Sequence, residues 1–403
     1  MRKRVFHLSL VPLIAAALLP LTCSGDTSAT KGVQSIPAMM QQFVDCEDIA
    51  GAVTLVARDG KILEFDAVGY SDLGTGSPMQ KDSLFWVASM TKPITSAAVL
   101  LLVSEGKIAL SDPIEKYLPD FRNQRLVIKK PDGTTASVPP SRPITIRDLL
   151  THTHGLEDPP LPAPKTSLSE NVAAIAKNPL QFEPGSQWKY GNAGMNTLGR
   201  IVEVVSGQPF EEFLQQTFFT PLGMKDTSFF PEPSQLQNLA RSYKRAPQWG
   251  SLVETSIGLI NGDLTKKEQA VFPGGGLFST AEDMFRFYQM LLNGGEFEGK
   301  RYLPEALVKD MTSPQTGELE AGFSAGMSWG LGVGIVRQPQ GWTDCLPSGA
   351  WGHDGACGTT VMADPKSKLL FIMMIQHAGL NPYTHGLRFR HAFHSAIVRS
   401  FLR

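Results

Sequence analysis

A serine and a lysine three residues apart can act as a nucleophile and its base, and the chain contains this pattern four times. The pairs are Ser28/Lys31, Ser89/Lys92, Ser104/Lys107 and Ser186/Lys189. Ser28 lies in a short polar segment, Ser104 at the end of an apolar run, and Ser186 in a Pro-Gly turn. Only Ser89 precedes a long, mostly apolar run, residues 94–103, which is typical of a buried helix. The context therefore selects Ser89 and Lys92.

Helical geometry is expected to bring the Ser89 hydroxyl close to the Lys92 amine. Residues at i and i+3 lie one turn apart on the same face of a helix. Because the residues after Lys92 are apolar on every face, we expect a buried helix, and burial lowers the pKa of a lysine. A neutral amine can accept the serine proton. Pro93 limits regular helix before it, so Ser89 is expected at the open end, where the helix dipole favours negative charge.

Two further motifs follow in the chain and supply polar groups that such a nucleophile needs. Tyr190-Gly191-Asn192 is the only Tyr-x-Asn sequence present. His353-Asp354-Gly355 lies in a glycine-rich stretch, residues 351–358, where small residues let a substrate approach the backbone. Each match alone is also compatible with an ordinary turn. Their combination with Ser89 favours a catalytic site.

Ser324 is a rival nucleophile, because Gly322-Phe323-Ser324-Ala325-Gly326 matches the Gly-x-Ser-x-Gly elbow of α/β-hydrolases. That elbow requires a strand before the serine and a helix after it. Here residues 313–320 are polar, and residues 329–336 are glycine-rich and strand-like. The context therefore argues against Ser324.

The histidine and cysteine residues are the candidates for metal binding and disulfide formation. His152 and His154 form a His-x-His pair, but no third ligand accompanies them at a suggestive spacing, so we expect no metal and no cofactor. The cysteines beyond the N-terminus are Cys46, Cys345 and Cys357. They allow one bridge, for which Cys345 and Cys357 are the nearest pair in sequence, or buried free thiols.

The length, composition and charge of the chain indicate a globular protein and argue against some classes of partner. The chain has 403 residues, of which 42% are hydrophobic and 19% charged, so it can bury a full core. The net charge is −1 and no long basic block is present, which argues against a nucleic-acid partner. A small-molecule or peptide substrate is the better expectation.

The N-terminus resembles an export signal. Three basic residues at positions 2–4 precede an apolar run, residues 5–21, that is shorter than a membrane-spanning helix needs. We expect a signal peptide at residues 1–24, a linker at 25–35, and a periplasmic or secreted mature chain without an integral membrane span. A lipid anchor at Cys23 is the alternative, although Pro20 and Thr22 are poor neighbours for that processing.

Strand patterns lie near both ends of the chain and helical patterns lie between them. Strands are predicted at residues 51–57, 62–69, 358–362 and 369–376, a short hairpin at 126–138, and helices at 198–205, 280–292 and 385–402. Ser279 and Glu282 predict a capping box for the helix at 280–292. We expect an α+β fold in one domain, residues 36–403, with a sheet region at about 36–105 and 270–403 and a helical region at about 106–269.

The three motifs and their flanking phrases resemble the penicillin-recognising serine hydrolases. This family contains class C β-lactamases, D-alanyl-D-alanine carboxypeptidases, D-aminopeptidases and esterases. The flanking phrases are PITIRDLLTHTHGL at 143–156, FEPGSQWKYGNAGMNTLGRIVEVVSG at 182–207 and GGGLFSTAEDM at 274–284. The resemblance covers residues 36–402 and implies a β-lactamase/transpeptidase-like fold, with an antiparallel sheet built from both chain ends and flanked by helices.

The resemblance also implies a role for each matching residue. Ser89 would form an acyl-enzyme, with Lys92 and Tyr190 sharing proton transfer. Asn192 would hold Lys92 and meet the substrate. His353 and Gly355 would line the substrate site, and the backbone N–H groups of Ser89 and Ala356 would form the oxyanion hole.

His353 stands where most β-lactamases of the family have lysine. At an ordinary pKa near 6.5 a histidine is largely neutral at pH 7, so it holds a β-lactam carboxylate less strongly. We therefore expect an ester or a D-amino-acid peptide as substrate in preference to a β-lactam. The alternatives are a true β-lactamase and a penicillin- or peptide-binding sensor that keeps its acyl group.

The choice of nucleophile can be tested by two alanine substitutions. Ser89→Ala is expected to lower hydrolysis of an activated ester by more than about a thousandfold, because the acyl-enzyme cannot form. Ser324→Ala is expected to leave the rate unchanged. Initial rates with a p-nitrophenyl ester measure both variants, and the reverse result would refute the assignment.

Overall fold

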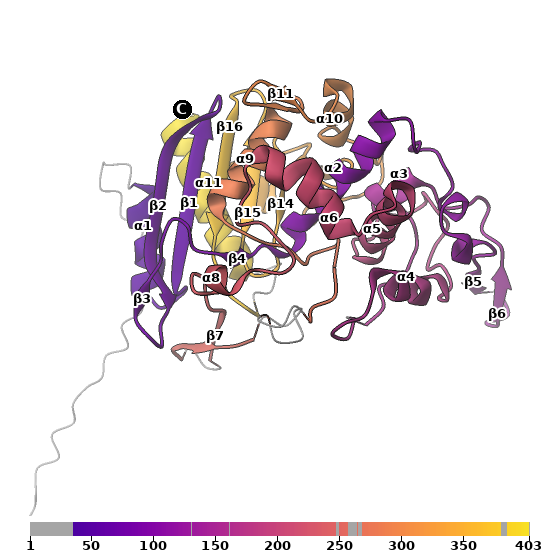
Figure 1. Cartoon of the computed structure of the whole chain (residues 1–403), viewed down its shortest axis with the longest axis horizontal. Coiled ribbons are helices and arrows are strands. Elements are labelled where there is room, and N and C mark those ends of the chain that lie inside the picture. Colours follow the sequence, from indigo (N-terminus) through magenta and orange to yellow (C-terminus); the bar gives the residue numbers. More distant parts are fainter. Residues whose placement is uncertain are drawn as a thin grey trace, which may run out of the picture. The chain divides into compact units, whose positions relative to one another are not determined.

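The computed structural model describes residues 35–402, apart from residues 130, 161, 247–249, 257–263, 265–267 and 380–384 (Figure 1). The predicted signal peptide, residues 25–34 of the predicted linker, and Cys23 lie outside the described residues. Within the described part of the chain, no helix has the length and apolar character needed to cross a membrane.

A large antiparallel sheet joins the two ends of the domain (Figure 1). Its strand order is β12-β13-β14-β15-β16-β1-β2-β3. These strands are β1 (Gly51–Arg58), β2 (Lys61–Asp72), β3 (Ser77–Pro78), β12 (Met327–Trp329), β13 (Gly334–Val336), β14 (Trp351–Asp354), β15 (Thr360–Asp364) and β16 (Leu369–Met374). β1 pairs with β16, so that Val53 lies opposite Met374 and Arg58 opposite Leu369. The predicted α+β class, with a sheet from both chain ends, is confirmed.

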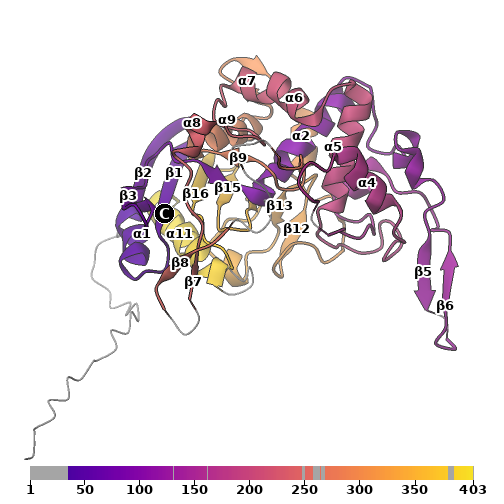
Figure 2. The same cartoon turned by 60° about the horizontal axis from the view of Figure 1, so that its bottom comes forward.

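Helices cover both faces of this sheet (Figures 1 and 2). In chain order, the helices of the described residues are α1 (Ile36–Asp45), α2 (Thr91–Ser104), α3 (Ile146–Leu150), α4 (Leu168–Ala176), α5 (Ala193–Ser206), α6 (Phe210–Leu214), α7 (Thr220–Leu222), α8 (Pro233–Leu236), α9 (Ala281–Leu292), α10 (Glu305–Met311) and α11 (His385–Phe401), of which α1 and α11 pack on one face of the sheet and α9 on the other. Successive side chains of β1 face opposite cores. Val53 and Leu55 pack into the core shared with α2, α5 and α9, whereas Ala52 and Val56 pack into the core shared with α1 and α11.

Shorter strand pairs and helical turns complete the fold. They are the strand pairs β4 (Phe85–Trp86) with β9 (Phe278–Ser279), β5 (Leu126–Lys129) with β6 (Thr135–Val138), β7 (Tyr243–Arg245) with β8 (Leu252–Glu254) and β10 (Glu296–Phe297) with β11 (Lys300–Arg301), and the helical turns η1 (Ala88–Met90), η2 (Ile114–Lys116), η3 (Pro119–Phe121), η4 (Gln215–Phe219) and η6 (Gly341–Thr343). The hairpin predicted at 126–138 is the pair β5–β6. The helix predicted at 198–205 is longer, spanning α5, and ends at Gly207 with φ +74°.

Two finer sequence expectations are corrected or resolved by the structure. The capping box predicted from Ser279 is wrong, because Thr280 caps α9 by accepting from the backbone N–H of Asp283. The Ser279 hydroxyl instead lies 2.7 Å from that of Thr227. Of the two alternatives for the cysteines, the structure shows free thiols at Cys345 and Cys357; Cys357 is buried and Cys345 is half-buried.

The loop that leads toward the predicted site is anchored by Asp148. Thr145 caps α3 and forms a capping box with Asp148. Both carboxylate oxygens of Asp148 also accept from Arg142, at 2.6 and 2.9 Å. Burial raises the pKa of Asp148, but the hydrogen bonds from Arg142 and Thr145 outweigh it, so the pKa lies below its ordinary value. The ionised carboxylate therefore stabilises the turn before residues 151–156.

Asp148→Asn is expected to lower the free energy of unfolding by about 1–3 kcal/mol, because the buried carboxylate loses charged hydrogen bonds. Since the folded pKa is depressed, this stability is present at neutral pH and is lost as the pH falls below about 4, the ordinary range for aspartate. Urea unfolding at pH 7 and at acidic pH measures the difference. Asp310→Asn, at an exposed position, is the control, and equal midpoints for the two variants at pH 7 would contradict the argument.

Candidate active site

Ser89 lies at the start of a helix, as its sequence context predicts. It sits in η1, a 3-10 turn that runs directly into α2. Ala88 has φ +48°, a left-handed conformation that costs energy for a residue with a side chain. Strain of this kind is common at functional sites. Ser89 is partly exposed, whereas Lys92 is completely buried.

The Lys92 amine contacts three oxygen atoms. Its Nζ donates to Ser89 Oγ at 3.1 Å, to Asn192 Oδ1 at 2.8 Å and to the backbone oxygen of Gly274 at 2.6 Å. Glycine is needed at 274, because a Cβ there would lie 2.8 Å from Asn192 Oδ1. The predicted nucleophile, base and amide are therefore brought together, from segments about a hundred residues apart.

Burial lowers the pKa of Lys92 into the range that a catalytic base needs at neutral pH. Removal from water lowers the pKa of Lys92 to about 7, while the negative charge of Asp158 acts in the opposite direction. Near pH 7 a substantial fraction of the amine is therefore neutral and can take a proton from Ser89. Catalytic bases are most effective when their pKa lies near the working pH.

Tyr190 completes the group on the other side of Lys92. The Lys92 Nζ lies over the tyrosine ring, 4.7 Å from its centroid. Burial raises the pKa of Tyr190 well above its ordinary value, although a hydrogen bond with Ser89 acts in the opposite direction. The phenol therefore stays protonated at neutral pH. These shifts favour Lys92 as the proton acceptor and Tyr190 as a proton donor or relay.

Asp158 belongs to this site, and the sequence argument missed it. Its Oδ1 accepts from the backbone N–H of Asn192 at 2.7 Å and of Ala193 at 2.6 Å. The carboxylate thus caps the first turn of α5 and holds Asn192 where its side chain meets Lys92. Asp158 lies 34 residues before Asn192, so no local spacing links the two residues. The only signal was an acidic residue in a proline-rich loop.

The third motif ends β14 and packs against the chain that precedes Ser89. A Cβ at Gly355 would lie 2.6 Å from the backbone oxygen of Val87, which explains the glycine. Ala356 follows at an exposed position. In the described chain, neither the Ala356 N–H nor the Ser89 N–H donates to another group of the protein. Both predicted oxyanion donors are therefore available to a substrate oxygen.

His353 is buried and electrically neutral. Burial, with a contribution from the Lys92 charge, lowers the pKa of His353 to about 3. Its Nδ1 donates to the backbone oxygen of Asp354 at 2.8 Å, which leaves the lone pair on Nε2. The ring lies 6.0 Å from that of Tyr190, centroid to centroid. His353 therefore offers no positive charge to a substrate at physiological pH.

Aromatic side chains surround Tyr190 and exclude water from the Lys92 amine. The rings of His152, Trp329 and Phe323 lie 4.7, 5.8 and 4.8 Å from the Tyr190 ring. Burial lowers the pKa of His152 well below its ordinary value. His154 Nδ1 already accepts from the backbone N–H of Leu156 at 2.9 Å. The histidine pair thus packs against the site, and one of its four ring nitrogens, His154 Nδ1, is already occupied by a backbone hydrogen bond.

The rival serine lies in a loop beside the aromatic side chains. Ser324 and Phe323 line a cavity of about 620 Å³, together with residues 318–322 and 325–327. A strand, β12, follows Ser324 where a nucleophile elbow would need a helix. The local structure therefore differs from that of an α/β-hydrolase elbow.

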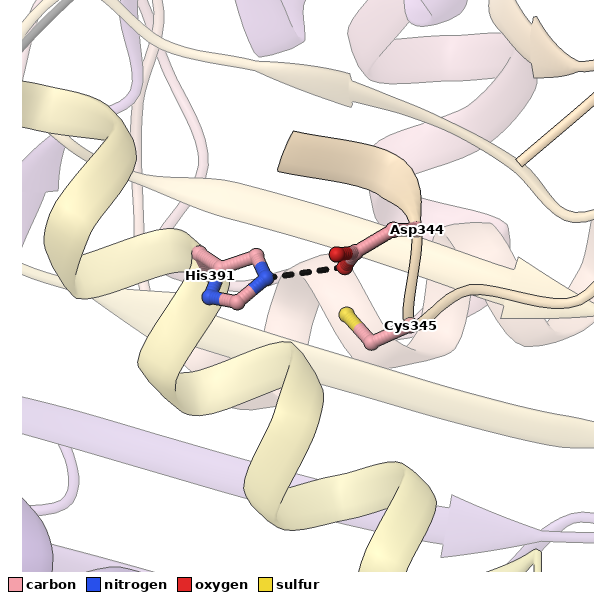
Figure 3. Close-up of side chains that lie close together, drawn as sticks. All are labelled: Asp344, Cys345 and His391. Atoms are coloured by element: carbon pink, nitrogen blue, oxygen red, sulfur yellow. Dashed lines mark hydrogen bonds and ion pairs between the residues drawn. The ribbon is translucent and has the colours of Figure 1, made fainter. Parts of the chain in front are cut away.

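A separate group of possible metal ligands joins η6 to α11 (Figure 3). Asp344, Cys345 and His391 place their ligand atoms within 4.8 Å of one another. His391 Nε2 lies 2.9 Å from Asp344 Oδ1, and the Asp344 side chain is exposed whereas that of His391 is half-buried. Burial raises the pKa of the Cys345 thiol, while the positive charge of Arg399 acts in the opposite direction. We interpret the His391–Asp344 contact as a hydrogen bond that holds α11 to the loop after η6.

Comparison with known proteins identifies the family. The beta-lactamase family model matches residues 36–395. The chain belongs to this family. It is 31% identical to esterase EstB of Burkholderia gladioli, over 79% of this chain and 83% of the esterase. It is 26% identical to a putative D-alanyl-D-alanine carboxypeptidase of Escherichia coli, over 93% and 90% of the two chains.

Solved structures agree with the fold of the beta-lactamase family. Unliganded simvastatin synthase LovD from Aspergillus terreus superimposes with a TM-score of 0.74, at 22% identity, and covers 92% of this chain and all of its own. The chain is therefore a serine hydrolase of the β-lactamase fold, within the penicillin-recognising family that its motifs indicate.

The influence of Asp158 on Lys92 can be measured from the pH dependence of kcat/KM. With a Lys92 pKa of about 7, activity is expected to fall as the pH drops below 7, because the amine becomes protonated. Asp158→Asn removes a charge that raises this pKa, so the acidic limb is expected to move to lower pH. The maximal rate is expected to fall by about tenfold, because Asn192 loses its support.

Glu157→Gln, at the neighbouring exposed acidic residue, is the matched control and is expected to keep the wild-type profile. An acidic limb that stays in place in Asp158→Asn would show that the carboxylate does not act on Lys92.

Proposed function

We propose that this protein is an exported serine hydrolase that cleaves carboxylic esters or D-amino-acid peptides through an acyl-enzyme. The observation that carries the proposal is the buried Lys92 amine, with a pKa of about 7 and 3.1 Å from the Ser89 hydroxyl. Relatives described as an esterase and as a putative D-alanyl-D-alanine carboxypeptidase support this substrate class.

The proposed acylation step begins at Ser89. Its Oγ attacks the substrate carbonyl carbon as Lys92 Nζ takes the hydroxyl proton. The carbonyl electrons move to oxygen, where the N–H groups of Ser89 and Ala356 stabilise the negative charge. When the tetrahedral adduct collapses, the bond to the leaving group breaks. The proton passes to that group from Lys92, directly or through the Tyr190 hydroxyl.

Deacylation follows the same path with water as the nucleophile. Water attacks the acyl carbon and gives a proton to Lys92, the ester bond to Ser89 breaks, and Ser89 regains its proton. The free carboxylic acid leaves. Asn192 keeps the amine aligned in both steps, because it is held by Asp158 on its other side.

The neutral His353 supports a preference for esters over β-lactams. A β-lactam carries a carboxylate, and a cationic residue at the third motif would attract it. The pKa of about 3 for His353 removes that charge at any pH where Lys92 is neutral. An ester with an uncharged acyl group has no carboxylate to attract, so the replacement of lysine by a neutral histidine does not weaken its binding.

Export is the part of the proposal that rests on the N-terminal sequence. Residues 1–24 combine a basic start with an apolar run, as signal peptides do. Expression of the full chain, followed by cell fractionation and N-terminal sequencing, tests it. A mature N-terminus near residue 25 in the periplasm or the medium is the expected result, whereas a lipid-modified Cys23 would support the membrane-anchored alternative.

Substrate preference is tested with a p-nitrophenyl ester, a D-alanyl-D-alanine peptide and nitrocefin. We expect kcat/KM for the ester to exceed that for nitrocefin by at least about tenfold, because nitrocefin carries a carboxylate that the neutral His353 cannot attract, whereas the ester carries none. The D-alanyl-D-alanine peptide also ends in a carboxylate, so its rate shows whether such a substrate is cleaved without a positive charge at position 353. The Ser89→Ala variant is the control for each substrate. Faster turnover of nitrocefin than of both other substrates would favour a β-lactamase.

Intact mass after incubation with penicillin distinguishes an enzyme from a sensor. We expect any acyl adduct on Ser89 to disappear within minutes to hours, as water completes the cycle. A stable adduct with no product release would favour the penicillin-binding sensor.

A further inference from the structure

A buried arginine lies directly behind the predicted oxyanion hole. Arg390, on α11, is only 5% exposed. Its Nη2 donates to the backbone oxygen of Gly355 at 2.7 Å. Gly355 immediately precedes Ala356, whose N–H is one of the two predicted oxyanion donors. A full positive charge is therefore bound to the glycine that completes the third motif.

The peptide bond transmits this contact to the site. The Gly355 carbonyl and the Ala356 N–H belong to the same planar peptide group, and no cis peptide bond occurs in the described residues. In a trans peptide the C=O and N–H bonds point in opposite directions. A guanidinium that holds the carbonyl therefore also sets the direction of the N–H. A cation at the oxygen also polarises the peptide and strengthens the N–H as a donor.

The neighbouring residues keep this arrangement rigid. The Arg390 Nε lies 3.6 Å from Asp354 Oδ1, which partly balances the buried charge. Asp354 Oδ1 in turn accepts from Thr360 Oγ1 at 2.5 Å, across the β14–β15 pair. The Gly355 N–H donates to the backbone oxygen of Thr359 at 2.8 Å. Gly355 is thus held at its N–H by Thr359, which immediately precedes β15, and at its carbonyl by Arg390 of α11 and by the Gly358 N–H at 3.1 Å.

We propose that Arg390 is a positioning residue, which orients and polarises the Ala356 N–H so that it can stabilise the oxyanion. This inference rests on the proposed function, because it assigns Ala356 to the oxyanion hole. It extends the site from the sheet to α11, the last helix of the chain. Arg390 acts through the peptide and does not touch the substrate.

The test compares Arg390→Gln with Arg388→Gln in the otherwise intact chain. Arg388 is the matched control, since it lies on the same helix, is half-exposed, and pairs with Asp48 away from the third motif. We expect Arg390→Gln to lower kcat for a p-nitrophenyl ester by about 10- to 100-fold with little change in KM, because only the transition state carries the oxyanion. Arg388→Gln is expected to keep both constants.

A boronic acid provides a readout that a purely structural role would not move. Its adduct with Ser89 is tetrahedral and places an oxygen in the oxyanion hole, so its affinity should fall by the same factor as kcat. Equal kcat and equal boronic-acid affinity in the two glutamine variants, both folded by circular dichroism, would overturn the proposal. Arg390→Lys is the second variant, for use if glutamine at 390 prevents folding. We expect it to lose about tenfold in kcat, because one ammonium cannot reproduce the fork of a guanidinium, and a wild-type kcat in that variant would equally overturn the proposal.

Ser89→Ala separates this inference from the proposed function. If Ser89→Ala keeps wild-type turnover, the acyl-enzyme mechanism fails and the role of Arg390 fails with it. If Ser89→Ala is inactive while Arg390→Gln behaves like Arg388→Gln, the mechanism stands and only the role of Arg390 is lost.

Discussion

The rest of the site depends on the burial of a single amine. Lys92 is enclosed by protein and contacts Ser89, Asn192 and the backbone of Gly274. Burial of a charge is costly, and the protein meets this cost by shifting the lysine pKa to about 7. The same shift makes the amine a base at neutral pH. In the proposed mechanism, stability and catalysis are therefore coupled at this residue, because the desolvation that disfavours the ammonium supplies the reactive form.

The fold assembles this environment from two regions of the chain. Ser89 lies next to the antiparallel sheet that both chain ends build, and the third motif lies at the end of β14, within that sheet. Tyr190 and Asn192 come from the loop before α5, on the helical side. Rigid supports lie behind each part: Asp158 holds the backbone of Asn192, and Arg390 holds that of Gly355. Both contacts join charged side chains to main-chain groups, so they fix geometry without occupying the space that a substrate needs.

Electrostatics at the third motif supports the proposed preference for esters over β-lactams. The positive charge that many family members carry at the third motif is absent at His353, which burial keeps neutral. A buried positive charge instead lies on the far side of the same segment, at Arg390. In that position it acts on the peptide group and not on a substrate carboxylate. The charge pattern therefore favours stabilisation of an oxyanion over capture of an anionic ligand.

Much of the fold and of the candidate site could be predicted from the sequence. The features that could not be predicted depend on contacts between distant parts of the chain. The serine-lysine spacing, the apolar run after Lys92 and the strand patterns at both chain ends are local features, and local periodicity determines which helices and strands form. The sequence predicted Ser279 as the capping residue of α9, whereas the structure shows Thr280, one position later. Either hydroxyl can cap a helix, and the long-range contact of Ser279 with Thr227 decides between them. Asp158 and Arg390 were not found, since each acts on a residue more than thirty positions away. The sequence by itself determined which side chains are available for chemistry. Only tertiary packing decided which of them are buried away from water, which are charged, and which contact one another, because desolvation and contact are properties of the assembled core.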